Sequence, residues 1–375
     1  MAQFELHVDR SDIEQICRDA DASWYAWKFA DVDLQEVVEA TDHAATTIRQ
    51  ALRAGHLARE ERFQEAKRLQ LVLFWQGRRL RDGDDIIILD GGMGRELFSV
   101  GAPFRQPEWS ALSLMEGPHF VSEVHDSFVA AGCDVITTNS YALVPFHLGA
   151  DVFALRGAAL VALAGELARN AAVGLVKVAG SLPPMASYSH SFDSLEVAEV
   201  SGVLVMSLEK YVDLWLIETQ STLEEARGIY EQTRNKPVWI SFTVDDGDGT
   251  RLRGGMSVEE AAKQAASWPR VEAILFNCSG RGAILDALKA SQSLRGVVRL
   301  GVCANAFKPR CKHSPEANVS VLPILAVQPL EYCEWSKECA MLGASILGGC
   351  CGISPAHISC IKKEMSSWKM GEMLC

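Results

Sequence analysis

Short apolar runs rich in β-branched residues recur along the chain from residue 86 onward, with longer segments between them. Most of these segments are long enough for a helix, and one carries Val121, Val124 and Phe128 on one helical face. Eight such strand–helix units in about 280 residues match the count and length of a (β/α)8 TIM barrel, an α/β fold. We therefore predict strands at residues 86–89, 135–138, 175–178, 214–217, 238–242, 273–276, 298–302 and 345–347.

A doubly wound open sheet is the alternative arrangement for alternating strands and helices. That fold normally carries a phosphate-binding loop directly after its first strand. Here the first strand is followed by Asp-Gly-Gly-Met-Gly at residues 90–94, which has neither the G-x-G-x-x-G pattern nor a Gly-Lys-Ser/Thr ending. The sequence therefore favours the barrel.

The first part of the chain has a different pattern. Residues 1–84 are rich in Ala, Glu, Arg and Gln, with a capping box at residues 11–14 and apolar residues at helical spacing. We predict a helical extension of unassigned role there, a barrel at residues 85–366 and a C-terminal tail at residues 367–375. The polar, turn-forming stretch at residues 81–85 marks the first boundary.

Composition narrows the classes of partner. The formal net charge of -12 argues against non-specific binding to nucleic acid or to an anionic membrane. No apolar run approaches the roughly 18 residues of a membrane span, and the N-terminus lacks the pattern of a signal peptide. We therefore expect a cytoplasmic protein that acts on small molecules, and leave open whether it is a homo-oligomer. The 11 cysteines, an odd number, favour thiols and a metal over disulfides.

Polar residues follow the predicted strands where each of them ends. In a TIM barrel these ends meet at the carboxyl face, which carries the active site. We therefore expect one site built from Asp90, Thr137, Tyr141, Glu218, Cys278, Asn305, Cys350 and Cys351.

Three of these residues are cysteines. Cys350 and Cys351 end the eighth strand between glycines, and Cys278 ends the sixth, which is a near neighbour in a closed barrel. Three thiolates around Zn²⁺ leave a position for an exchangeable ligand, and their negative charge suits an electron-rich sulfur better than activated water. The sequence thus predicts a zinc site that accepts a substrate thiol. A vicinal disulfide, or buried thiols without metal, are the alternatives.

Two carboxylates lie at the same predicted face. Asp90 could hold a substrate ammonium group, or it could cap the helix that follows. Glu218 ends a buried strand, so it is either salt-bridged within the barrel or available to a cationic ligand. Together the two carboxylates favour a binding site for the α-amino group of a substrate. Residues 244–249 lack the spacing of a calcium loop, and we expect a loop over the barrel mouth there.

Several motifs in order give the chain a specific resemblance. Between residues 86 and 363 the chain resembles the homocysteine S-methyltransferase family, and the Asn-Cys-Ser motif combined with Gly-Gly-Cys-Cys-Gly is the most specific part. The motifs are Asp-Gly-Gly-Met-Gly at 90–94, Thr-Asn-Ser-Tyr at 138–141, Gly-Ser-Leu-Pro-Pro at 180–184, Ile-Glu-Thr at 217–219, Ser-Phe at 241–242, Asn-Cys-Ser at 277–279 and Gly-Gly-Cys-Cys-Gly at 348–352.

The resemblance carries expectations for individual residues. It implies that Cys278, Cys350 and Cys351 bind zinc and that Asp90 and Glu218 contact homocysteine. It also implies that Asn305, which follows the seventh strand, lies near the metal before homocysteine binds.

We therefore predict zinc-dependent methyl transfer from a sulfonium or ammonium donor to the thiol of L-homocysteine, giving L-methionine. S-methylmethionine or S-adenosylmethionine is favoured over betaine, because Ser-Leu-Pro-Pro at 181–184 and Asp-Asp-Gly at 245–247 look more like the S-methylmethionine-type enzymes. The helical extension and the segment at 307–315 depart from the family pattern, which leaves the donor open. The alternatives are transfer to another thiol or selenol, and a non-catalytic zinc- or thiol-binding barrel with the extension as an interaction module.

Overall fold

The structure is a computed structural model of the chain, and it describes residues 86–185, 194–307 and 326–367. The predicted helical extension at 1–84 lies outside these ranges, as does the predicted tail beyond Ser367. The bounds of all helices and strands below refer to the described part of the chain.

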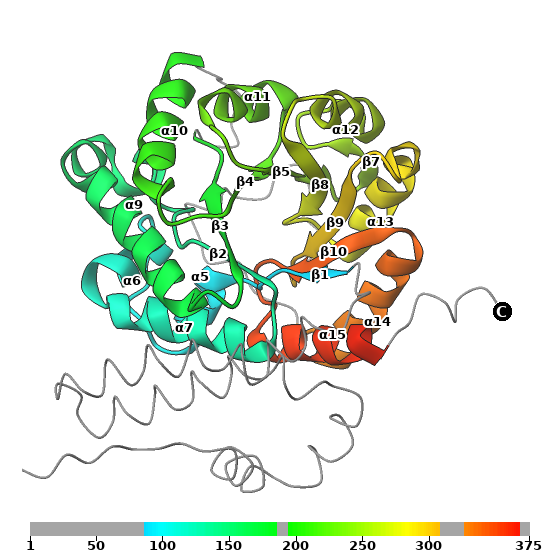
Figure 1. Cartoon of the computed structure of the whole chain (residues 1–375), viewed down its shortest axis with the longest axis horizontal. Coiled ribbons are helices and arrows are strands. Elements are labelled where there is room, and N and C mark those ends of the chain that lie inside the picture. Colours follow the sequence, from blue (N-terminus) through cyan, green and yellow to red (C-terminus); the bar gives the residue numbers. More distant parts are fainter. Residues whose placement is uncertain (1–85, 186–193, 308–325, 368–375) are drawn as a thin grey trace, which may run out of the picture. The chain divides into compact units, whose positions relative to one another are not determined.

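Eight parallel strands form one sheet in the order β1-β10-β9-β8-β5-β4-β3-β2. The sheet closes on itself, because Leu89 bridges Val135 and the Asp90 N–H donates to the Val135 carbonyl at 3.1 Å. The predicted TIM barrel is therefore confirmed (Figure 1). Its strands are β1 (Ile87–Ile88), β2 (Val135–Thr137), β3 (Lys177–Leu182), β4 (Leu214–Gln220), β5 (Val238–Phe242), β8 (Val271–Asn277), β9 (Arg299–Ala304) and β10 (Ala344–Gly349).

Each predicted apolar run lies in one of these strands, but the prediction for β3 was displaced. Leu175 belongs to the turn before the strand, where its N–H donates to the Ala172 carbonyl at 2.8 Å. The strand instead continues through Gly180 and Ser181, which are small enough for the crowded barrel wall. An added Cβ at Gly180 would lie 2.8 Å from the Trp215 ring.

Helices surround the barrel (Figure 1). The predicted face of Val121, Val124 and Phe128 is buried, as expected for a helix that packs on strands. Two helices begin with capping residues: Thr222 accepts from the Glu225 N–H and Ser257 from the Glu260 N–H. The helices are α5 (Met93–Ser99), α6 (Ser110–Glu116), α7 (Pro118–Ala131), α8 (Pro145–Leu148), α9 (Ala150–Ala172), α10 (Ser194–Leu208), α11 (Leu223–Gln232), α12 (Val258–Ala266), α13 (Arg281–Ala290), α14 (Pro329–Met341) and α15 (Pro355–Ser367).

None of the helices in the described ranges combines the length and apolar character needed to cross a membrane. The cytoplasmic location stays a prediction.

The barrel interior is filled by side chains below the pocket at its mouth. Leu214, Trp239 and Leu275 belong to the inner apolar cluster. Gly301 on β9 is required by this packing, because a Cβ there would lie 2.7 Å from the Leu275 side chain. The interior is thus a packed core, as in other TIM barrels.

Residues 244–252 form a two-stranded antiparallel hairpin, β6 (Val244–Asp245) and β7 (Asp248–Leu252), rather than the loop that we expected. The hairpin packs closely on α13: an added Cβ at Gly249 would lie 2.2 Å from the Ala283 carbonyl oxygen. Asp245 closes its turn by accepting from the Gly247 N–H at 2.8 Å. The segment is therefore an ordered part of the barrel rim.

Candidate active site

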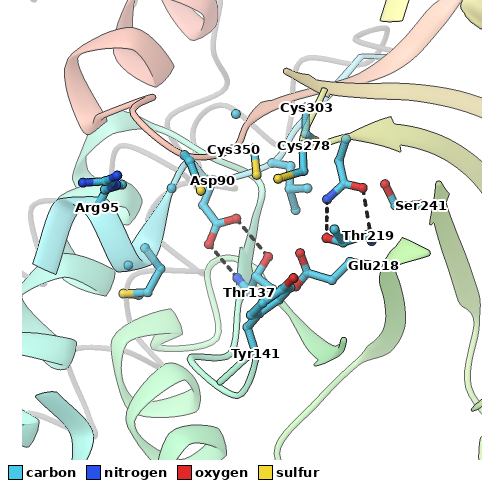
Figure 2. A pocket seen from close by; sticks show the side chains of 18 of the residues that line it. Asp90, Arg95, Thr137, Tyr141, Glu218, Thr219, Ser241, Cys278, Cys303 and Cys350 are labelled. Atoms are coloured by element: carbon cyan, nitrogen blue, oxygen red, sulfur yellow. Dashed lines mark hydrogen bonds between the residues drawn. The ribbon is translucent and has the colours of Figure 1, made fainter. Parts of the chain in front are cut away.

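The three predicted cysteines meet at the carboxyl end of the barrel. Cys278 directly follows β8, and Cys350 and Cys351 directly follow β10. Their sulfur atoms all lie within 4.8 Å of one another, and each cysteine is free of a disulfide (Figure 2). Within the described ranges, no other group of three or more His, Cys, Asp or Glu residues could hold a metal ion. The vicinal-disulfide alternative is therefore absent from this structure.

The donor set fits a thiophilic metal ion. A tetrahedral Zn²⁺ with Zn–S bonds of about 2.3 Å requires sulfur atoms about 3.8 Å apart, which the cluster can reach with a small contraction. The hydrogen bond with Cys278, followed by that with Cys351 and by burial, raises the pKa of Cys350 well above its usual value. The hydrogen bond with Cys278 likewise raises the pKa of Cys351 to about 12. The cluster therefore favours protonated thiols, and a cation between the three sulfur atoms would favour the thiolate forms.

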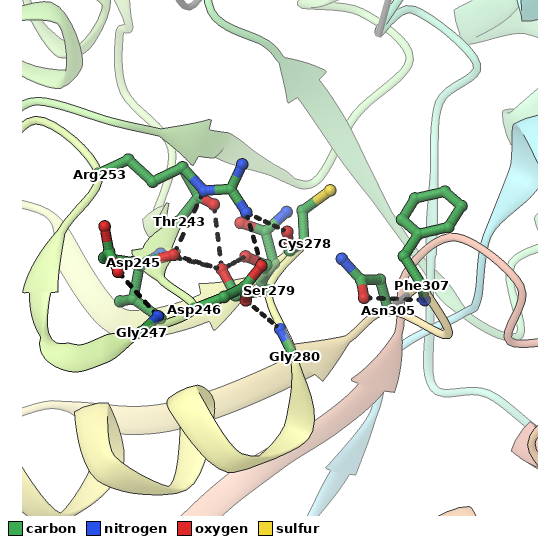
Figure 3. A network of polar contacts seen from close by, with 12 residues as sticks. Thr243, Asp245, Asp246, Gly247, Arg253, Cys278, Ser279, Gly280, Asn305 and Phe307 are labelled. Carbon is green, nitrogen blue, oxygen red and sulfur yellow. Dashed lines mark hydrogen bonds and ion pairs between the residues drawn. The ribbon is translucent and has the colours of Figure 1, made fainter. Parts of the chain in front are cut away.

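The backbone of Cys278 is held in a strained conformation. Its φ of 51° lies in the left-handed region, which costs a non-glycine residue about 1 kcal/mol. The Arg253 guanidinium donates to the Cys278 carbonyl at 3.2 Å and to the Val244 carbonyl at 3.3 Å (Figure 3). Arg253 is itself paired with Asp246 at 3.6 Å. The β6–β7 hairpin thus fixes the backbone that presents the Cys278 thiol.

A second strained residue lies beside it. Thr219, at the end of β4, has a φ of 61°. The Asn277 side chain binds it twice: its amide oxygen accepts from the Thr219 N–H at 3.1 Å, and its NH₂ donates to the Thr219 hydroxyl at 2.8 Å. One asparagine side chain therefore ties the end of β4 to the residue that precedes Cys278.

The Asp-Gly-Gly motif passes directly over the cysteine pair. An added Cβ at Gly92 would lie 2.5 Å from the Cys350 carbonyl oxygen, and one at Gly91 would lie 2.3 Å from the Ile353 carbonyl oxygen. The Gly349 N–H also donates to the Asp90 carbonyl at 2.9 Å. The glycines are thus needed because any side chain would separate Asp90 from the thiols.

Asp90 is 3% exposed and is held by one residue of the next strand. Its carboxylate accepts from the Thr137 N–H at 2.7 Å and from the Thr137 hydroxyl at 2.9 Å. Burial, opposed by these hydrogen bonds, raises the pKa of Asp90 to about 7. The helix-cap alternative is wrong, because α5 begins after Gly92 and no side chain caps it.

Glu218 lines the same pocket from β4. The Ser181 hydroxyl donates to its carboxylate at 2.5 Å, and burial raises the pKa of Glu218 to about 7. No ion pair of Glu218 occurs among the described residues, so the barrel supplies no salt bridge. Buried Asp90 and half-buried Glu218 therefore gain most from a cationic ligand that enters the pocket.

The remaining predicted residues divide between two adjoining pockets. Thr137 and Tyr141 line the pocket that contains the thiols and carboxylates. Asn305 instead lines the neighbouring pocket with Asp246 and Gly280, and its amide oxygen accepts from the Phe307 N–H at 3.1 Å. Phe307 forms part of both walls. The structure thus brings every predicted site residue except Asn305 into one cavity.

Among the residues that line the thiol pocket, sequence reasoning gave no site role to Arg95, Trp109, Ser241 or Phe307. Ser241 lies on β5, and the strand-end argument that found Glu218 could also have found it. Trp109 precedes α6 with a φ of 53°, and nothing in the sequence shows that this turn brings its ring into the barrel mouth. Arg95 lies in the first turn of α5, where it looks like an ordinary surface arginine.

Together, the fold and the site define a TIM-barrel enzyme with a cluster of three thiols and two carboxyl groups in its mouth. Residues 87–365 match the family model described as homocysteine S-methyltransferase. The chain therefore belongs to the homocysteine S-methyltransferase family, which confirms the resemblance found in the motifs. The matched region begins after the predicted helical extension.

Individual relatives cover the same part of the chain. The homocysteine S-methyltransferase of Escherichia coli K12 is 27% identical over 312 residues, which are 76% of this chain and 97% of the relative. A selenocysteine methyltransferase of Astragalus bisulcatus is 25% identical over 323 residues, which are 75% of this chain and 92% of the relative. The metallated form of the Escherichia coli homocysteine methyltransferase MmuM has a TM-score of 0.61 and 26% identity, covering 76% of this chain and 99% of that one.

Proposed function

We propose that the protein transfers a methyl group from a sulfonium or ammonium donor to the thiol of L-homocysteine, giving L-methionine, with Zn²⁺ held by Cys278, Cys350 and Cys351. The observation that carries this proposal is the meeting of three sulfur atoms, within 4.8 Å of one another, with one buried and one half-buried carboxyl in one pocket. The thiols suit the sulfur end of homocysteine, and the carboxyls suit its ammonium end.

Zinc is the proposed metal because three thiolates select a soft or borderline ion and zinc needs no redox chemistry. A structure of the relative MmuM is described as a metallated form. When bound, Zn²⁺ lowers the pKa of a coordinating thiol, so that a substrate sulfur would be a nucleophilic thiolate near neutral pH.

Asp90 and Glu218 would bind the α-ammonium group and orient the amino acid. Thr137 and Ser181 hold these carboxyls in place through hydrogen bonds of 2.5–2.9 Å. A cation near both carboxyls favours their ionised forms, so binding of homocysteine would lower the pKa values that burial raises. Recognition of the ammonium group would therefore be coupled to proton release from the pocket.

The donor would occupy the rest of the pocket, beside Trp109 and Tyr141. The two rings pack edge to face with centroids 6.3 Å apart, and both line the cavity. Aromatic faces attract sulfonium and quaternary ammonium ions. In the transfer, the substrate sulfur forms a bond to the methyl carbon while the bond from that carbon to the onium atom breaks. The donor leaves as a neutral thioether or amine.

Orientation supplies most of the rate enhancement in this scheme, because no proton needs to move in the transfer step. S-methylmethionine or S-adenosylmethionine is the proposed donor, ahead of betaine, on the motif resemblance at residues 181–184 and 245–247.

A selenol acceptor is the second candidate. Two of the curated relatives are named as selenocysteine methyltransferases, at 24% and 25% identity. Asp90 and Glu218 would bind the ammonium group of homocysteine or of selenocysteine equally well. The methyl acceptor must therefore be identified by experiment.

The test is a transfer assay with purified protein of known metal content. Homocysteine and selenocysteine are each offered S-methylmethionine, S-adenosylmethionine or betaine, with and without a chelator. We expect stoichiometric zinc and chelator-sensitive methionine formation with a sulfonium donor. Metal binding without product from any donor would instead indicate a non-catalytic barrel.

A further inference from the structure

One charged side chain in the pocket has no part in the scheme above. Arg95, in the first turn of α5, is 8% exposed and lines the same cavity as the thiols (Figure 2). Among the described residues that line this cavity, it is the one with a permanent positive charge. The other ionisable groups there are carboxyls, thiols and the phenol of Tyr141, so Arg95 changes what the pocket can recognise.

Arg95 belongs to one side of the pocket and Glu218 to another. Arg95 lies on α5, directly after β1, whereas Glu218 lies on β4, and β2 and β3 separate these strands in the closed barrel. The Arg95 guanidinium carbon lies 5.5 Å from the centre of the Phe307 ring. Phe307 is fixed in turn by the bond from its N–H to Asn305. The guanidinium is therefore held at the pocket wall beside Phe307.

A second hydrogen-bond donor lines the same cavity. The indole N–H of Trp109 is buried and finds no acceptor in the described part of the chain. Trp109 directly precedes α6, which packs on α5. A guanidinium and a buried N–H that line one cavity are suited to an anionic group such as a carboxylate.

We propose that Arg95 binds the carboxylate of the methyl donor, which makes the donor an onium ion that also carries a carboxylate group. This inference rests on the proposed function. In that scheme the thiols and the two carboxyls of the pocket take homocysteine by its sulfur and its ammonium group, which leaves the region of Arg95, Trp109 and Tyr141 for the second substrate. The rings face the onium centre and the guanidinium takes the carboxylate as a planar, bidentate pair.

The test compares a sulfonium ion that carries a carboxylate with one that does not. S-methylmethionine carries a carboxylate and an ammonium group and trimethylsulfonium carries neither, but a guanidinium attracts only the carboxylate. The variants are Arg95→Gln, which removes the charge, and Arg95→Lys, which keeps it without the bidentate geometry. Arg156→Gln, at an exposed position of α9, is the matched control. Steady-state kinetics give KM for each donor and for homocysteine, and calorimetry without homocysteine gives the Kd of each sulfonium ion.

Arg95→Gln should raise both KM and Kd for S-methylmethionine about 10- to 100-fold, the loss expected for a charge-assisted pair. The values for trimethylsulfonium and for homocysteine should stay within about twofold, and Arg95→Lys should recover part of the loss. Equal effects on both sulfonium ions, a rise in KM for homocysteine alone, or loss of bound metal would each overturn the assignment. If the unchanged protein transfers no methyl group from any donor, the proposed function fails, while the two Kd values still decide the role of Arg95.

Discussion

Replacing Asp90 by asparagine should stabilise the ligand-free protein and weaken its binding of homocysteine. Asparagine keeps the shape of the side chain and both contacts with Thr137, since its oxygen can accept from the N–H and its NH₂ can donate to the hydroxyl. The substitution therefore removes the ionisable group with little change in packing.

The magnitude follows from linkage. Burial raises the pKa of Asp90 from 3.8 to about 7 in the folded protein, so the folded state favours the protonated form. Stability from this group is fully present below pH 3.8 and is lost as the pH rises through about 7. At pH 8 the loss approaches about 4 kcal/mol, and at pH 5 it is about 1.5 kcal/mol. We expect Asp90→Asn to recover much of the free energy of unfolding that ionisation of Asp90 removes. Its gain in stability should therefore be larger at pH 8 than at pH 5.

The assay is urea unfolding of the metal-matched proteins at both pH values, with Asp286→Asn as an exposed control that should stay within about 0.5 kcal/mol. The KM for homocysteine should rise about 10- to 100-fold in Asp90→Asn, because one charged partner of the ammonium group is gone. A stability gain that is equal at the two pH values, or a loss at pH 8, would refute the reasoning, since neither can come from an ionised buried carboxyl.

Three further predictions concern the thiols, the hairpin and a buried histidine. Cys278→Ala should remove the bound metal and abolish turnover, measured by metal analysis and methionine formation, while Cys360→Ser should keep both; a metal-loaded Cys278→Ala protein would contradict the site. Arg253→Met should weaken metal binding about tenfold in competition with a chelator, because the Cys278 carbonyl loses its hydrogen bond with the guanidinium, while Arg251→Met, on β7, should have no effect. His125 is fully buried with neither ring nitrogen bonded in the described structure, and burial lowers its pKa from 6.5 to about 3, so stability is lost as the pH falls below 6.5, by about 2 kcal/mol at pH 5. His125→Leu should remove that acid sensitivity in thermal unfolding, and an unchanged pH profile would show that another group is responsible.

The sequence was most informative for residues at the ends of the apolar runs. Cys278, Glu218 and Cys350 follow apolar strands, and parallel strands in a barrel must end at one face, so their meeting could be predicted without knowing any side-chain conformation. The strand ends were less certain: Ser181 is polar, yet β3 runs through it because its hydroxyl is bonded to Glu218 inside the pocket.

Residues outside regular elements could not be placed in the same way. Trp109 enters the pocket through a turn with a left-handed residue, and Asn305 lies in the adjoining pocket because its side chain is bonded to the backbone of Phe307. Arg95 lies on a helix, but its role depends on the close approach of the Asp-Gly-Gly loop to the cysteine pair, which only the folded backbone reveals.

The link through Asn277 between Thr219 and Cys278 has a consequence for how this rim can evolve. Thr219 and Cys278 both adopt a left-handed backbone conformation that a side chain disfavours. The free energy needed to shape this part of the pocket is therefore supplied during folding, and not when the substrate binds. Variants that remove the backbone strain at Thr219 or Cys278 should unfold at a higher temperature and have a lower turnover rate. Selection for stability and selection for activity would therefore oppose each other at these positions.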